Sequence, residues 1–196
     1  ATPGSNGRGQ PLIMPQTRCR SAIISIAIGL AVVSTSVQSF TKSPPPEVAS
    51  ALRAPKLVST AEMSFLFWRL FRAELWSNDG AFNWDKSFAL SLTYDMEFSA
   101  DELTDKTITE IDRLTDWSTP ALAALRDKLS PCMATVGDGD RFTAVGVSPD
   151  KVVLFLNSRE QCQLETLDLR RAFFQIWLSD NSQFPTESRR LKGVGN

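Results

Sequence analysis

Residues 63–76 read MSFLFWRLFRAELW, and residues 88–98 read FALSLTYDMEF. In both stretches large apolar side chains recur at every second position, which is the period of a β-strand. We therefore predict one long strand over 63–76 and a second over about 87–98. The segment SNDG at 77–80 is a turn signal between them.

Two helices are expected after these strands. Ser99 and Glu102 form a capping box in front of an amphipathic stretch that ends near Leu114. Thr119 caps the second predicted helix, and Pro120 suits its first position because proline needs no hydrogen-bond partner there.

The chain then returns to strands, which are predicted over 141–147, 152–156 and, as an edge strand, 161–165. A last helix is expected over 167–178. The order of strands, helices, strands and helix is typical of an α+β domain and differs from the regular alternation of a doubly wound fold.

The first 39 residues resemble an export signal. Arg8, Arg18 and Arg20 precede a short apolar run over 22–34, and no acid occurs before it. This run is shorter than the roughly 20 residues that a membrane-spanning helix needs. We expect a signal peptide over 1–39 and a periplasmic or secreted protein with no stable membrane anchor after its removal. A retained anchor and a core element of the domain are the alternatives.

Residues 40–53 contain the segment SPPP at 43–46, which is predicted to be a proline-rich linker. The domain itself is expected over 54–194.

Composition excludes several classes of protein. The chain has 196 residues, a net charge of -1 and no histidine. Triad hydrolases and most zinc enzymes need an imidazole, and nucleic-acid binding needs a basic surface. The segment GDGD at 137–140 lacks the further ligand positions of a calcium loop and is predicted to be a turn. We predict no metal, no cofactor and no nucleic acid.

Four residues are candidates for ligand binding. Arg69 shares a face of the first predicted strand with Phe67 and Phe71, and a cation beside apolar surface needs an anion or water. Tyr94 is the only tyrosine and falls on the buried face of the next strand. The alternatives are a paired or snorkelling arginine and a core tyrosine with one satisfied hydroxyl.

Cys132 and Cys162 remain after signal removal. In an oxidising compartment they could form one disulfide, and two partly buried free thiols are the alternative.

The order of motifs resembles the bacterial chalcone-isomerase-like family. The resemblance rests on the segments 61–82, 88–103 and 139–157, and most specifically on LRRAFFQIWLSD at 169–180. It implies an antiparallel sheet packed against helices, an open-faced sandwich, and exported members of unassigned function.

The resemblance does not carry the family's chemistry over to this chain. Plant-type chalcone isomerases hold a phenolate with an arginine, for which this chain has no matching residue. Glu62 and Phe71 stand where members of the family often carry an arginine and a tyrosine. Arg69 and Tyr94 therefore match no motif of relatives that bind fatty-acid carboxylates.

Three functions remain open. The first is a non-catalytic domain that binds an apolar or amphipathic, fatty-acid-like molecule between sheet and helices, with Arg69 or Tyr94 at its polar end. The second is an isomerase or lyase acting on a small aromatic or enone substrate, in which Arg69 stabilises an oxyanion and Tyr94 donates. The third is an interaction module with a protein partner in the cell envelope, contacted through Trp76 and Trp84.

Overall fold

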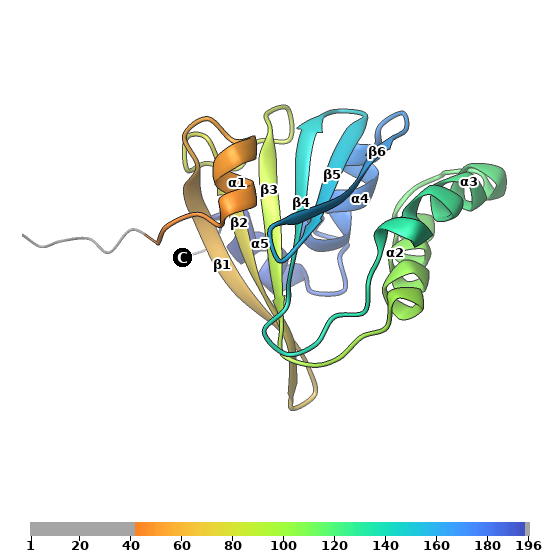
Figure 1. The fold of residues 1–196 in the computed structure, drawn as a ribbon, viewed down its shortest axis with the longest axis horizontal. Helices are drawn as coiled ribbons and strands as arrows, with labels where there is room; N and C mark the ends of the chain where they lie inside the picture. The colour runs from red at the N-terminus through yellow and green to blue at the C-terminus, as the bar shows by residue number, and fades with distance from the viewer. Residues whose placement is uncertain (1–41, 195–196) are drawn as a thin grey trace, which may run out of the picture. The chain divides into compact units, whose positions relative to one another are not determined.

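The computed structural model describes residues 42–194 (Figure 1), so the predicted signal peptide lies outside the described residues. Six strands form one sheet, and each strand runs antiparallel to the next along the chain. The strands are β1 (Lys56–Phe65), β2 (Trp68–Ser77), β3 (Phe88–Tyr94), β4 (Arg141–Ser148), β5 (Lys151–Leu156) and β6 (Arg159–Glu165). The predicted α+β class, with an antiparallel sheet packed against helices, is confirmed.

Helices cover both faces of this sheet to different extents. They are α1 (Pro46–Ala51), α2 (Ala100–Leu114), α3 (Thr119–Leu129), the 3-10 turn η1 (Ser130–Cys132), α4 (Leu169–Leu178) and α5 (Pro185–Leu191). Figure 1 shows α1 on one side of the sheet and α4 and α5 on the other. The capping box of Ser99 and Glu102 is present at the start of α2, whereas the cap of α3 is Ser118 rather than Thr119.

The first predicted strand is wrong in one respect, because residues 63–76 fold back on themselves. The chain turns at Leu66 and Phe67, and Phe65 pairs with Trp68 across the hairpin. Leu66 takes a left-handed backbone conformation with φ of 55°. No glycine, proline or asparagine marks this turn, and the apolar alternation continues through it, so the sequence carried no sign of the break.

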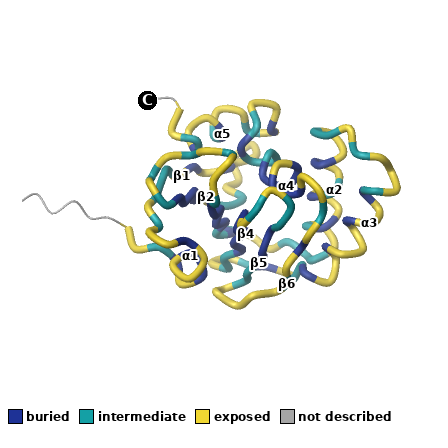
Figure 2. The backbone as a smooth tube through the Cα atoms, turned by 90° about the horizontal axis from the view of Figure 1, so that it is seen from above, coloured by how far each residue is buried: buried dark blue, intermediate teal, exposed yellow. Residues whose placement is uncertain are grey.

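The tip of this hairpin, residues 65–68, is exposed to solvent. Phe67 is 99% exposed, and Phe65, Leu66 and Trp68 are also exposed large apolar residues. Figure 2 shows the contrast between the buried middle of the sheet and the exposed connections around it.

The predicted linker over 40–53 differs from the structure, since it contains α1. Val48 and Leu52 pack there against Trp76, Ala89 and Val145 on one face of the sheet. The SPPP segment therefore leads directly into a helix that begins with Pro46, a position where proline is well tolerated.

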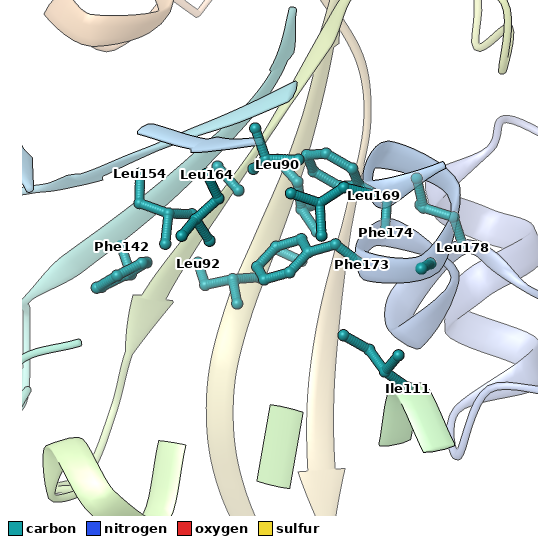
Figure 3. Close-up of a cluster of buried hydrophobic side chains, with 14 of the residues drawn as sticks. Leu90, Leu92, Ile111, Phe142, Leu154, Leu164, Leu169, Phe173, Phe174 and Leu178 are labelled. Atoms are coloured by element: carbon teal, nitrogen blue, oxygen red, sulfur yellow. The ribbon is translucent and has the colours of Figure 1, made fainter. Parts of the chain in front are cut away.

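The larger core lies on the opposite face, between the sheet and helices α2 to α5. Figure 3 shows Leu90, Leu92, Phe142 and Leu154 of the sheet beside Phe173 of α4. Gly146 of β4 lets α4 approach closely, because a Cβ there would lie 2.7 Å from Cδ of Arg170 and 3.1 Å from the Phe174 ring.

A buried carboxylate joins α1 to the sheet. Glu47 accepts hydrogen bonds from Arg141 Nε at 2.9 Å, Thr143 Oγ1 at 2.7 Å and Ser158 Oγ at 2.9 Å. Burial alone would raise the pKa of Glu47, but the hydrogen bonds from Arg141, Thr143 and Ser158 outweigh it and hold the pKa below its ordinary value.

We predict that Glu47→Gln lowers the free energy of unfolding at neutral pH by about 1–3 kcal/mol, because the network loses the negative charge and one of the two oxygens that accept its hydrogen bonds. The folded-state pKa lies below the ordinary value of 4.5, so this stabilisation is present above that value and disappears as the pH falls through the folded-state pKa. Urea unfolding across the acidic range measures it, with the exposed Glu97→Gln as the control. If the difference in free energy of unfolding between wild type and Glu47→Gln did not change with pH, Glu47 would not be the ionised acceptor of this network.

Candidate functional site

A cavity of about 530 Å³ lies between the sheet and helix α2. Helix α2 packs chiefly against α3 and α4 rather than on the sheet, which leaves room beneath it. The volume falls within the range of roughly 300–1,000 Å³ that small-molecule sites occupy. Strands β2, β3 and β4, helices α2 and α4, and the segment before α5 form its walls.

The walls are predominantly apolar. The sheet contributes Leu70, Phe71, Leu90, Leu92, Tyr94, Phe142 and Ala144, and α4 contributes Phe173, Ile176 and Trp177. Figure 3 shows Leu90, Leu92 and Phe142 on the sheet and Phe173 pointing toward them from α4. A ligand that reached this space would exchange water for aromatic and aliphatic surface, which favours an apolar molecule.

Helix α2 supplies the polar part of the wall, with Glu110 at its centre. The side chain of Glu110 is only 3% exposed and lies 2.6 Å from Arg113 Nη2 and 3.4 Å from Lys106 Nζ. Gln183 Nε2 donates to the same carboxylate at 2.6 Å, and Arg113 Nη1 donates to the carbonyl of Asn181 at 2.9 Å. These bonds tie α2 to the segment between α4 and α5.

Tyr94 is the polar group on the sheet side. Its ring lies between Phe71 and Phe98, with centroid distances of 5.7 and 5.6 Å, and the residue is 5% exposed. Residues 42–194 provide no hydrogen bond to its hydroxyl, but the hydroxyl borders the cavity and is not sealed in, since Trp76 Nε1 is the one fully buried side-chain polar atom of this range without a partner. Burial raises the pKa of Tyr94 far above its ordinary value, so the phenol is neutral and can donate one hydrogen bond.

Of the four predicted ligand-binding residues, the structure brings Phe71 and Tyr94 together in the cavity wall and leaves the other two outside it. Arg69 is exposed and forms a two-pronged ion pair with Asp95, at 2.8 and 2.9 Å, with Glu62 at 3.5 Å. Phe67 lies at the hairpin tip. The turn at residues 66 and 67 explains the position of Phe67. Arg69 and Phe71 both follow the turn, but the pairing of β1 with β2 is irregular between them, where Leu70 has no partner in β1, so the alternation of faces is broken there.

The predicted partner contact is wrong at Trp76 and stays a prediction at Trp84, which is half-buried. Trp76 is completely buried under α1. Trp84 packs against Phe82 and Phe88, and the guanidinium of Arg171 lies 4.3 Å from the centre of its ring. Four consecutive large apolar residues are exposed at the hairpin tip, residues 65–68.

The helical side of the cavity was not identified from the sequence. Phe173, Ile176 and Trp177 lie on the face of α4 that packs against the core, and they also line the cavity. An apolar stripe looks the same whether it meets a protein surface or a space, so periodicity cannot find a cavity wall.

A disulfide fixes the helices to the far edge of the sheet. Cys132 in η1 and Cys162 in β6 are bonded, with their Cα atoms 5.5 Å apart. The link connects the end of α3 to the edge strand, and so holds the layer of α2 and α3 beside the sheet.

The segment GDGD forms a turn, in which the Asp140 carboxylate accepts a hydrogen bond from the backbone N–H of Gly137 at 2.8 Å. Within the described range no cluster of three or more histidine, cysteine or acidic side chains is arranged to hold a metal ion. The same range contains no helix with the length and hydropathy required to cross a membrane.

Comparison with known proteins agrees with this architecture. A family model described as chalcone isomerase-like matches residues 75–188. A solved structure of an Arabidopsis thaliana fatty-acid binding protein, AtFAP1, is similar with a TM-score of 0.57 and 7% identity, over 71% of this chain and 86% of that one. At this identity the similarity concerns the fold. A comparison with curated protein sequences found no match. Because the family match spans more than half of the chain, from β2 into α5, the protein belongs to the chalcone isomerase-like family.

Proposed function

We propose that this domain binds an apolar or amphipathic small molecule, of the size of a fatty acid, in the cavity between the sheet and α2. One observation carries the proposal: a largely apolar cavity of about 530 Å³ has in its wall a single tyrosine, Tyr94, whose hydroxyl borders the cavity and is free to bond a ligand. A hydrogen bond from this hydroxyl to a ligand oxygen would contribute about 0.5–1.5 kcal/mol to binding.

The fold comparison supports the proposal, since AtFAP1 is a fatty-acid binding protein. We propose binding without catalysis. The isomerase hypothesis required Arg69 and Tyr94 to act on one substrate, and Arg69 lies outside the cavity wall in an exposed ion pair with Asp95. Tyr94 alone offers a donor but no positive charge to stabilise an oxyanion.

We also propose that the protein is exported to the periplasm or secreted. The basic, acid-free start and the short apolar run over 22–34 support export. The Cys132–Cys162 bond supports it as well, because structural disulfides persist in oxidising compartments and are rare in the cytosol.

The binding proposal predicts that Ala144→Phe weakens binding of the neutral apolar dye Nile red by at least about tenfold, because the new ring occupies the cavity. Ala144 lines the cavity, whereas Ala51→Phe, at the exposed end of α1, is the matched control and should leave binding unchanged. Fluorescence titration measures both. Equal affinities for the two variants, with unchanged thermal midpoints, would place the dye elsewhere and refute the proposal.

The state of Tyr94 can be tested directly, since it is the only tyrosine in the chain. We expect no tyrosinate absorbance in the folded protein near the ordinary pKa of 10.0, and normal ionisation after denaturation. Because the pKa is raised in the folded state, pH above the ordinary value favours the unfolded state. Reversible ionisation of the folded protein near pH 10 would show that the phenol is solvated.

Export predicts that the protein recovered from the cells that make it begins close to Phe40. Sequencing of its N-terminus and fractionation of the cells test this. Recovery in the cytosol with residues 1–39 still attached would contradict the proposal.

A further inference from the structure

The cavity wall holds polar groups in two places, Tyr94 on the sheet and the side chains of α2. Each place determines which polar end of a ligand it can accept. The charges and hydrogen bonds at these two places restrict the head group of a ligand more than the apolar walls restrict its chain.

The Tyr94 side is uncharged and aromatic. Phe71 and Phe98 flank the phenol, and Arg69, the cation expected beside it, does not line the cavity. A carboxylate placed against this hydroxyl would be removed from water with no positive charge to compensate. An unpaired buried anion is costly by several kcal/mol, whereas a neutral oxygen acceptor needs only the one hydrogen bond that the phenol supplies.

The α2 side is acidic. Glu102, Asp105 and Glu110 line the cavity there, and Lys106 is the one basic residue among the lining residues of the described chain. Lys106 Nζ already lies 3.4 Å from Glu110 Oε1. Backbone and hydroxyl hydrogen bonds from Ser99 lower the pKa of Glu102, which therefore stays ionised near neutral pH. Glu110 is also paired with Arg113, and Asp105 with Arg126, so the cations near this end are already engaged by carboxylates. A ligand carboxylate here would have to compete with these acids for their cations.

We propose that the cavity accepts neutral amphiphiles, whose polar end is a ketone, ester or alcohol oxygen bound by the Tyr94 hydroxyl, and that it discriminates against long-chain carboxylates. This inference rests on the proposed binding function and narrows it. The proposed ligand is about as large as a fatty acid, and its head group is uncharged.

The test compares ligands that share a chain and differ in the head group. Displacement of Nile red is measured for methyl decanoate, decan-1-ol, undecan-2-one and decanoate. At about pH 8 the three neutral ligands should bind at least about tenfold more tightly than decanoate, which is fully ionised there. Decanoate should gain affinity as the pH falls toward its own pKa, while the methyl ester should not change.

The outcomes separate this inference from the function on which it rests. Decanoate binding at least as tightly as its methyl ester at about pH 8 would overturn the neutral head group and leave the binding function standing. Failure of Nile red and of every ligand to bind would overturn both.

Tyr94→Phe tests the hydrogen bond itself. The variant should lose about threefold to tenfold in affinity for undecan-2-one, since one neutral hydrogen bond is removed. Its affinity for undecane, measured by displacement of Nile red, should stay as in wild type, because undecane has no hydrogen-bond acceptor. An equal loss for ketone and hydrocarbon would show that the ring shapes the cavity without recognising the oxygen, and would refute the role of the hydroxyl.

Discussion

The position of α2 relative to the sheet is the constraint on which the candidate site depends. An amphipathic helix above an apolar sheet would normally pack against it, because protein interiors are filled to the density of organic crystals. Here α2 is held in place by contacts with the segments beside it. Glu110 and Arg113 bond it to the segment between α4 and α5, Asp105 forms an ion pair with Arg126 of α3, and η1, which follows α3, is joined to β6 by the disulfide. The space beneath α2 is a result of these attachments.

The two faces of the sheet differ in the hydrogen bonding of one polar residue each, Glu47 and Tyr94. On the α1 face, Glu47 is surrounded by donors from Arg141, Thr143 and Ser158, and the small core beside it is closed. On the α2 face, Tyr94 is left without such a partner within residues 42–194. The α1 face is not satisfied throughout, because Trp76 Nε1 there is the one fully buried side-chain polar atom of residues 42–194 without a partner. The Tyr94 hydroxyl differs from it in bordering the cavity, where a ligand can reach it.

The sequence was sufficient for the class of fold because most elements carry local signals. The alternation in β3, the capping box of α2 and the apolar stripe of α4 each depend on residues close together in the chain. Where the local signal was absent, prediction failed. The hairpin turn at Leu66 has none of the usual turn residues, and α1 is short and follows three prolines.

The site was predicted less well, for a related reason. Phe71 and Tyr94 were found because they face inward from neighbouring strands, and they pair across β2 and β3. Arg69 was placed with them by counting alternate residues along β2, where the unrecognised irregularity at Leu70 breaks the alternation. The distance between α2 and the sheet is set by contacts between residues far apart in sequence, such as Cys132 with Cys162 and Glu110 with Gln183. A single sequence contains no periodicity that reveals those contacts.

The hairpin tip at residues 65–68 has a separate consequence for how the chain's stability is distributed. Its large apolar side chains are hydrated in the folded protein much as they are in the unfolded chain, so their hydrophobicity contributes little to the free energy difference between the two states. The apolar character of these four positions is therefore not accounted for by folding, in contrast to that of Leu75 or Leu90 in the core. Any constraint on it has to come from the solubility of the folded molecule or from what that surface touches.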